Sequence, residues 1–463
     1  MSAVIHVPFH GTGAGEADLS WGQREIWAAM CAQESSLSGG SADPLPEGRT
    51  VDYAVSLLSF IMGRYPSYRT RLRFEPNGAV RQVLSDHGEI PLHIVDVPDD
   101  ADPAEAAETL RSDWVRQKFD YENEWPIRMG VLRHRGALTH SVAVHCHLAM
   151  DGGGIQNVLT DLATYNGIDG APADDTGPAP DQQDSLDQVR WQQSRSGERH
   201  HAMVVRHWRK LLSQVPSGRF GDTDDERDPR YWRVTGRSAA AQVATHAISN
   251  RVGRGDTSPV LMAATAVALA RVTGKNPTVL QVVVNNRFRP GLAATVGPVA
   301  QSGLCAIDVA GGTFDDAVER AWRSLMSAYL NAYYDPDRMA AAIDELGRER
   351  GAPIDLDCFF NDHRGPSERE YTGGPPSPAA LEAAARMTTT WGPHSALPVP
   401  RFYVHVFDAP DAIELLVHAD TRYLPPADIT AFLNRFEEVL VDAAFDSTVR
   451  TGVSEAEAVA GRP

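Results

Sequence analysis

Residues 145–154 read HCHLAMDGGG, and this stretch ends an apolar strand with an imidazole before the chain turns sharply. Residues 141–144 (SVAV) favour a strand, and apolar residues then recur at helical spacing between residues 155 and 162. The pattern predicts a strand-to-helix loop with His147 at the mouth of a sheet.

The residue types in this loop suit acyl transfer. A free imidazole, with a pKa of about 6.5, can accept a proton from an amine, alcohol or thiol that attacks a carbonyl. The following glycines let backbone N–H groups approach a bound group closely, because no Cβ blocks them. Asp151 could orient the imidazole, or it could pair with a distant arginine and pin the loop, and we favour the second. A lone histidine is more often a packed or surface residue than a catalyst, so the loop needs support from other segments.

Length and composition limit the protein class. The 463 residues predict two lobes of about two hundred residues each. There are 43 Lys and Arg against 61 Asp and Glu, a formal charge of −18, which argues against a nucleic-acid partner. The 4 cysteines form no C-x-x-C pair and predict reduced thiols in a reducing cytoplasm. We find no export signal and no apolar run of about 18 residues, so we expect no membrane partner and a cytoplasmic location.

Two stretches rich in Pro, Gly and charged residues predict loops. Residues 170–187 mark a boundary, and we predict an N-terminal lobe at 1–177, a linker at 178–187 and a C-terminal lobe at 188–463. Residues 364–378 predict an exposed loop near the substrate path.

Alternating helical and strand patterns predict a layered α/β protein. The predicted helices span residues 22–33, 50–64, 104–119, 258–272, 314–332 and 428–444, and the predicted strands span 69–74, 79–84, 278–284, 402–406 and 413–418.

Several segments, in the right order and over nearly the whole chain, resemble the condensation domains of nonribosomal peptide synthetases. Residues 19–27 (LSWGQREIW) resemble the family pattern S-x-A-Q-x-R-L-W, and residues 65–74 (YPSYRTRLRF) resemble R-H-E-x-L-R-T-x-F. Residues 147–152 (HLAMDG) match the latter part of H-H-x-x-x-D-G. Further matches are residues 190–192 (RWQ) with 207–209 (HWR), 286–290 (NRFRP) with 296–298 (VGP) and Asp308, and 423–429 (YLPPADI).

The resemblance implies a fold and a site. The fold is α/β, with two chloramphenicol-acetyltransferase-like lobes in a V-shaped pseudodimer and a central tunnel. His147 becomes the base or positioning group beside the nucleophile, and Gly152 a backbone donor near the developing oxyanion. Asp151 becomes the structural partner of Arg287. Weaker tunnel candidates are Gly153, Ser302, Asn361 and Trp391, although core packing of Trp391 and a turn role for Asn361 are alternatives.

The implied activity is that of an acyltransferase of specialised metabolism. A carrier protein presents an acyl or aminoacyl group as a phosphopantetheine thioester, and a small-molecule amine or alcohol attacks it to give an amide or ester. We find no adenylation signature and no phosphopantetheine attachment motif, so we expect a freestanding enzyme that meets an acyl or peptidyl carrier protein in trans. It would need no cofactor and no metal of its own. The alternatives are a catalytically silent docking module and a coenzyme A-dependent acyltransferase.

Departures from the family pattern also carry predictions. Cys146 replaces the first histidine of the motif and, on an alternating strand, points away from His147. Residues 299–308 differ from the family segment, so substrate identity stays open. His200, His201 and His207 lie on a polar helical pattern and are interpreted as a solvated face without metal.

Overall fold

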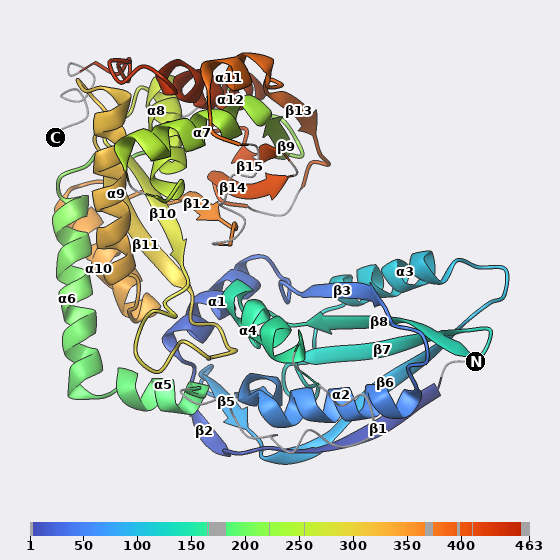
Figure 1. Ribbon diagram of the computed structural model, residues 1–463. Helices are drawn as coiled ribbons and strands as arrows, with labels where there is room; N and C mark the ends of the chain where they lie inside the picture. The colour runs from blue at the N-terminus through green and yellow to red at the C-terminus, as the bar shows by residue number, and fades with distance from the viewer. Residues whose placement is uncertain are drawn as a thin grey trace. The chain divides into compact units, whose positions relative to one another are not determined.

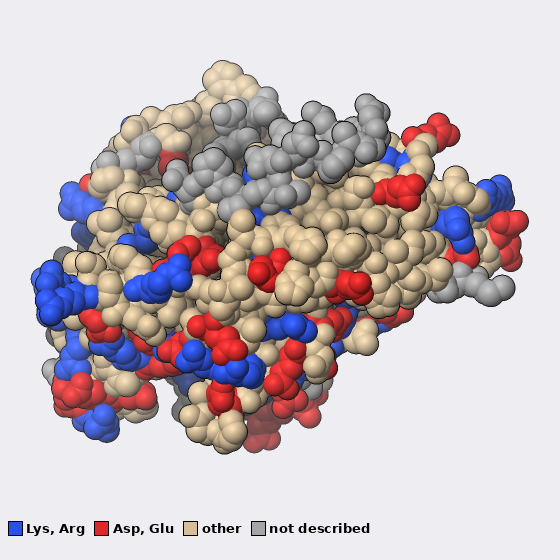
Figure 2. Space-filling view, turned by 90° about the horizontal axis from the view of Figure 1, so that it is seen from below, with Lys and Arg blue, Asp and Glu red and all other residues tan. Residues whose placement is uncertain are grey.

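Strands and helices alternate along the chain and form two compact units (Figure 1). This computed structural model describes residues 3–163, 165, 182–221, 223–253, 255–365, 374–395, 399–409 and 411–454. Unit 1 comprises Met1–His200 and Asn285–Gln301, and unit 2 comprises His201–Val284 and Ser302–Pro463. Lys and Arg are mixed with Asp and Glu over the face that Figure 2 shows.

Unit 1 is built on a sheet with the strand order β1-β6-β7-β8-β3, beside a small sheet with the order β2-β5-β4. Its strands are β1 (Ala3–His10), β2 (Gly15–Asp18), β3 (Gly39–Pro44), β4 (Thr70–Phe74), β5 (Val80–Leu84), β6 (His87–Val97), β7 (Ile127–His134) and β8 (Ala137–His145). Strands β6 and β7 run parallel, because helix α3 crosses between them, while β7 and β8 form an antiparallel pair.

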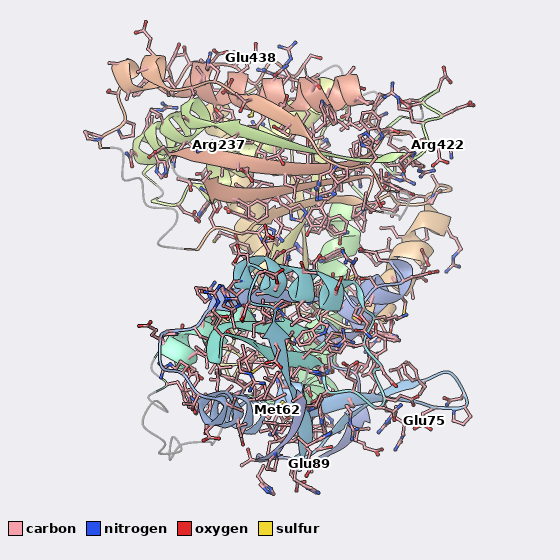
Figure 3. The ribbon with its side chains drawn as sticks, turned by 90° about the vertical axis from the view of Figure 1, so that its right-hand side faces the viewer. Met62, Glu75, Glu89, Arg237, Arg422 and Glu438 are labelled. Atoms are coloured by element: carbon pink, nitrogen blue, oxygen red, sulfur yellow. The ribbon has the colours of Figure 1, made fainter. Side chains whose placement is uncertain are left out.

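The helices of unit 1 cover both faces of the larger sheet. They are α1 (Trp21–Ala32), α2 (Val51–Arg64), α3 (Pro103–Arg116), α4 (Gly152–Ala163) and α5 (Ser185–Gln192), with a 3-10 turn at Pro66–Arg69. Helix α2 packs with Val7, Leu92 and Val131 in one cluster, which includes the fully buried Met62 (Figure 3). Ala107 of α3 packs with Val142 and Val144 in a second cluster. The inner strands β6, β7 and β8 therefore contribute side chains to two different cores.

Unit 2 contains a sheet with the strand order β11-β10-β12-β14-β15-β9-β13. Its strands are β9 (Tyr231–Ser238), β10 (Thr278–Val284), β11 (Gln301–Ile307), β12 (Cys358–Asp362), β13 (Thr388–Trp391), β14 (Phe402–Ala409) and β15 (Ala412–Asp420). Its helices are α7 (Ala239–Val252), α8 (Ser258–Thr273), α9 (Phe314–Leu330), α10 (Pro336–Glu349), α11 (Pro378–Ala383) and α12 (Pro426–Ala443).

Helix α8 is the centre of the unit 2 core. It is buried from Ser258 to Ala270, because α7, α9 and α12 pack around it on one side of the sheet. A helix surrounded in this way can be apolar on every side, as this one is. A smaller cluster joins Trp208 of helix α6 (Arg195–Leu212) to Met339 and Leu346 of α10.

The helices and strands that the sequence predicts are confirmed within a few residues of their bounds. The boundary between the two compact units does not fall in the predicted linker at 178–187. Residues 170–181 lie outside the described residues, but Ser185–Gln192 forms α5, and the side chain of Gln192 accepts a hydrogen bond from the backbone N–H of Trp21 at 3.1 Å. The change of unit therefore falls after His200. Of the predicted loop at 364–378, residues 366–373 lie outside the described residues, and α11 begins at Pro378.

Candidate active site

The turn that follows β8 places His147 at the end of the sheet of unit 1. The backbone N–H of His147 donates to the carbonyl of Ser36 at 3.3 Å, and the N–H of Met150 donates back to the His147 carbonyl at 3.3 Å. The imidazole is half-buried. Its Nδ1 is enclosed and has no hydrogen-bond partner among the described residues, which leaves Nε2 as the nitrogen open to a reactant.

Cys146 points to the other side of the strand, as its alternation predicts. Its side chain is 0% exposed and packs with Val142 and Val144. Burial raises the pKa of the Cys146 thiol to about 12, so the thiol stays protonated and unreactive. The residue that replaces the first histidine of the motif is a core residue here.

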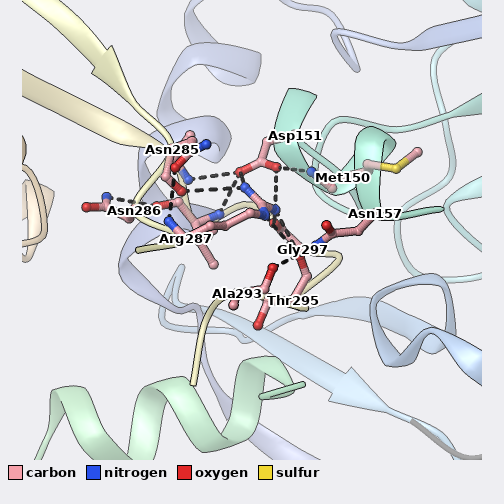
Figure 4. Close-up of polar contacts among 12 residues, drawn as sticks. Met150, Asp151, Asn157, Asn285, Asn286, Arg287, Ala293, Thr295 and Gly297 are labelled. Carbon is pink, nitrogen blue, oxygen red and sulfur yellow. Dashed lines mark hydrogen bonds and ion pairs between the residues drawn. The ribbon is translucent and has the colours of Figure 1, made fainter. Parts of the chain in front are cut away.

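The turn is held by a buried ion pair between Asp151 and Arg287 (Figure 4). Asp151 Oδ1 lies 2.6 Å from Arg287 Nη2, and the two side chains are only 4% and 9% exposed. The same carboxylate accepts hydrogen bonds from the backbone N–H groups of Gly154 at 2.8 Å and of Val299 and Ala300 at 2.9 Å each. A buried carboxylate with this many donors is well compensated for its loss of water.

The arginine is equally well bonded and fixes the segment Asn285–Gln301 to helix α4. The guanidinium donates to the carbonyls of Thr295 at 3.0 Å and Gly297 at 3.1 Å. From α4, the side chain of Asn157 donates to the carbonyls of Ala293 at 3.0 Å and Thr295 at 3.2 Å. Residues from two distant parts of the sequence therefore set the position of the turn.

Helix α4 begins with three glycines, and at Gly153 a side chain would collide with its surroundings. A Cβ at Gly153 would lie 2.4 Å from Arg287 Nη1, so only glycine lets the guanidinium lie over the turn. A Cβ at Gly152 would meet nothing within 4 Å, and the backbone N–H of Gly152 has no acceptor among the described residues. The first N–H groups of a helix carry partial positive charge, and this one is available to an oxyanion.

The remaining sequence candidates belong to unit 2. The backbone carbonyl of Ser302, on β11, accepts a hydrogen bond from the Tyr334 hydroxyl at 2.9 Å. Asn361, on β12, lies 3.0 Å from His363 Nε2 through its side-chain amide. Trp391, on β13, packs edge-on against Trp232 with ring centroids 5.4 Å apart. The structure thus brings together His147, Asp151, Gly152, Gly153 and Arg287 within unit 1, and it places these three residues in the other unit.

Two residues near His147 were not assigned by the sequence analysis. The ring of His145 is mostly buried, and burial, followed by the neighbouring His147, lowers the pKa of His145 to about 4. Residues two positions apart on a strand point to the same side, so the spacing of His145 and His147 is a sequence signal that could have placed the two rings close together. Ser36 accepts from the His147 N–H, and its hydroxyl lies 2.9 Å from the Tyr121 hydroxyl and accepts from the Phe119 N–H at 2.9 Å. No motif marks Ser36, so only the fold reveals it.

The prediction of a solvated histidine face on α6 is wrong for His201. This side chain is 3% exposed, and its Nδ1 accepts a hydrogen bond from the backbone N–H of Asp335 at 3.2 Å. His207 Nε2 lies 3.1 Å from the Ser327 hydroxyl. In the part of the chain that the structure describes, no three His, Cys, Asp or Glu side chains converge as metal ligands would. Within the same residues, no helix has both the length and the apolarity needed to cross a membrane.

The chain matches the family model of the Condensation domain over residues 55–363, about two thirds of its length. Among curated proteins, the nonribosomal peptide synthetase kk1B of Curvularia clavata is 23% identical over 295 residues. That match covers 60% of this chain and spans only 2% of the length of the synthetase.

Solved structures show the same fold. A condensation domain that mediates chain release from the enacyloxin polyketide synthase has a TM-score of 0.68 at 18% identity, covering 96% of this chain and 85% of the other. The SgcC5 protein of Streptomyces globisporus has a TM-score of 0.67 at 18% identity, covering 94% of this chain and 100% of the other. The fold is therefore the two-lobed, chloramphenicol-acetyltransferase-like fold of condensation domains. The chain belongs to the condensation-domain family, whose members act in nonribosomal peptide and polyketide biosynthesis.

Proposed function

We propose that this chain is a condensation enzyme of specialised metabolism. It joins an acyl or aminoacyl thioester, held on the phosphopantetheine arm of a carrier protein in trans, to a small-molecule amine or alcohol. The observation that carries the proposal is the half-buried His147 with an open Nε2, on a turn braced by the buried Asp151–Arg287 pair. A docking module without activity would not need so many buried hydrogen bonds to fix one histidine.

In the proposed reaction, the new C–N or C–O bond forms as the C–S bond of the thioester breaks. The proton of the nucleophile ends on the leaving thiol. His147 Nε2 holds the N–H or O–H of the nucleophile in line with the carbonyl. We assign His147 to positioning and polarising the nucleophile through Nε2, the acceptor nitrogen of the tautomer that carries its proton on Nδ1.

Gly152 is proposed to stabilise the negative charge that develops on the carbonyl oxygen. Its backbone N–H is the first donor of α4 and carries the partial positive charge of the helix N-terminus. Asp151 and Arg287 are supporting residues in this scheme, because their buried pair holds the turn that carries both groups.

The test is the replacement of His147 in a thioester assay. Purified protein is incubated with a panel of acyl- and aminoacyl-pantetheine thioesters and amine or alcohol acceptors, and free thiol and product mass are measured. We expect His147→Ala to lower turnover by about 10²–10⁴-fold, the usual contribution of such a group, with an unchanged circular dichroism spectrum.

The matched control is His140→Ala, which removes another partly buried imidazole from β8, away from the turn. Its turnover should stay close to that of the wild type. A folded His147→Ala variant with wild-type turnover would remove the assigned role. A wild-type protein that consumes no thioester of the panel would favour the silent docking module.

A further inference from the structure

Strand β8 carries a second imidazole beside the candidate site of unit 1. His145 is the last residue of β8, and His147 follows two positions later. The odd-numbered residues from 141 to 147 are half-buried, whereas the even-numbered residues between them are buried. The alternation of a strand therefore continues as far as His147, and both imidazoles lie on the same side of the sheet.

The glycine opposite His145 leaves space beside one nitrogen of its ring. Gly39 lies on β3, an edge strand of the sheet, and is the register partner of His145 (Figure 1). A Cβ at position 39 would lie 3.3 Å from His145 Nε2 and 3.7 Å from its Cε1, so a side chain there would crowd the ring. The next register pair on the same side, Ser41 with Ala143, is also small. The side chains of β3 and β8 therefore leave the Nε2 edge of the ring uncovered.

The imidazole of His145 forms no hydrogen bond or ion pair among the described residues. Buried polar groups of proteins are almost always hydrogen-bonded, so a half-buried ring without a protein partner points to a partner from outside the chain. Burial, followed by the neighbouring His147, lowers the pKa of His145 to about 4. The ring is therefore neutral at neutral pH and keeps one nitrogen that can accept a hydrogen bond.

We propose that His145 is a second hydrogen-bond acceptor for the nucleophile, and that the nucleophile is a primary amine. This inference rests on the proposed function and deepens it by naming the class of acceptor substrate. A primary amine has two N–H groups and one lone pair. His147 Nε2 accepts from one N–H and His145 from the other, which leaves the lone pair free to attack the thioester carbonyl.

The spacing of the two rings suits a shared nitrogen. The Cα atoms of residues two apart on a strand are about 7 Å apart, and each hydrogen bond spans about 2.9 Å, so both rings can reach one amine. In the reaction, the C–N bond forms and the C–S bond breaks. One of the two N–H protons ends on the leaving thiol, and the other stays on the amide nitrogen.

Other nucleophiles and another role for His145 fit less well. An alcohol or a secondary amine offers a single O–H or N–H, so one of the two acceptors would stay unpaired in a partly buried site. A role for His145 as the base is disfavoured, because a ring with a pKa near 4 binds a proton weakly.

The experiment compares matched nucleophiles. Each set contains a primary amine, its N-methyl derivative and the corresponding alcohol, on butyl, phenethyl and indolylethyl skeletons, and the donors are acyl-pantetheine thioesters. The variants His145→Phe and His145→Leu remove the acceptor at two side-chain sizes, and His145→Gln supplies a carbonyl acceptor instead. The control is His140→Phe, the same change at another partly buried imidazole of β8. Circular dichroism identifies the variants that fold as the wild type does.

We expect the wild type to use primary amines, and the folded variants without an acceptor to lower kcat/KM for them by about tenfold. For the N-methyl amines and the alcohols, kcat/KM should change by less than about twofold in the same variants. His145→Gln should restore the value for primary amines to within about threefold of the wild type, and His140→Phe should leave it within about twofold. If the wild type uses primary amines alone, the rescue by His145→Gln decides the result.

An equal loss with all three kinds of nucleophile would assign His145 a structural role and refute the inference. An unchanged kcat/KM for primary amines in the folded variants, or a failure of His145→Gln to restore it, would also refute it. A wild type that turns over the thioesters with alcohols alone would refute the inference and leave the proposed function standing. Absence of thioester turnover with every nucleophile would refute the proposed function, on which the inference rests.

Discussion

The carboxylate of Asp151 joins three parts of unit 1: the turn of His147, the start of α4 and the segment Asn285–Gln301. Both oxygens are used, one by Gly154 and one by Val299 and Ala300, and Arg287 supplies the opposite charge. Removing one member of such a pair leaves a buried charge without a partner, which costs far more than an exposed ion pair contributes. The residue therefore acts on stability first, and under the proposed function it acts on chemistry only through the turn.

We expect Asp151→Asn to lower the free energy of unfolding by about 3–5 kcal/mol, because the amide cannot accept from all of these N–H groups and leaves Arg287 buried and unpaired. Urea unfolding monitored by tryptophan fluorescence measures the change. Asp161→Asn is the control, since Asp161 pairs with Arg64 at 3.1 Å in a more exposed position, and we expect a loss of about 1 kcal/mol there. Equal losses in the two variants would contradict the argument.

Part of this site follows from local sequence and part does not. The orientation of Cys146 follows from the two-residue period of a strand, and the turn follows from the glycines after Asp151. The contact between His147 and Ser36 does not follow, because residues more than a hundred positions apart meet only when β3 pairs with β8. Likewise, the enclosure of Nδ1 depends on packing from several elements, which no single segment encodes.

At the scale of elements, one face of the unit 2 sheet carries histidines instead of a core. His363 Nε2 lies 2.9 Å from His405 Nδ1, and the His405 ring stacks on Tyr403 with centroids 3.9 Å apart. Burial, followed by the neighbouring His363 and His418, lowers the pKa of His405 to about 3. The pKa values of His363 and His418 are also lowered, chiefly by burial. These rings are therefore neutral in the folded protein at pH values where free histidine is charged.

This face makes stability depend on pH in a definite direction. The unfolded chain binds a proton at His405 near pH 6.5, while the folded chain does so only near pH 3. Between these values the unfolded state holds more protons. The contribution of His405 to the free energy of unfolding is therefore largest above about pH 6.5 and decreases as the pH is lowered. We expect His405→Gln to reduce proton uptake on unfolding between pH 6.5 and 4 by about one, measured from urea unfolding at several pH values. His6→Gln, at an exposed position of β1, should leave the slope unchanged, and an unchanged slope in His405→Gln would disprove the assignment.

The elements also show where sequence patterns suffice. Helices α8 and α12 and strand β10 are long apolar or strongly periodic segments, and their predicted bounds are within two residues of the observed ones. Strand β6 was not predicted, because Pro91 and His93 interrupt its apolar pattern, although its backbone pairs with β1 and β7 over its length. Helix α6 was interpreted as polar from its charged residues, and its buried side was missed although Val204, Trp208 and Leu212 recur there at helical spacing.

At the scale of the whole molecule, the four thiols divide into one reachable group and three that are closed off. Cys31 is exposed, while Cys146, Cys305 and Cys358 are buried. Burial raises the pKa of Cys305 to about 12 and raises that of Cys358 as well. A thiol that is both buried and protonated reacts slowly with alkylating reagents.

We therefore expect iodoacetamide at pH 8 to label one cysteine in the native protein and four in urea, as read from intact mass. A Cys31→Ser variant should take up no label under native conditions. Rapid native labelling of two or more positions would show that one of the cores opens readily.

The ion pair of Asp151 with Arg287 has a consequence for how such proteins can be divided or recombined. Arg287 reaches unit 1 from a short excursion of the chain between two stretches of unit 2, so the first 200 residues lack the cation that neutralises their own buried carboxylate. A gene fragment that ends there would encode an incomplete module, and a chimera with a single crossover would combine an aspartate and an arginine from different parents. Exchange of unit 1 between homologues must therefore carry Asn285–Gln301 with it as a second insert.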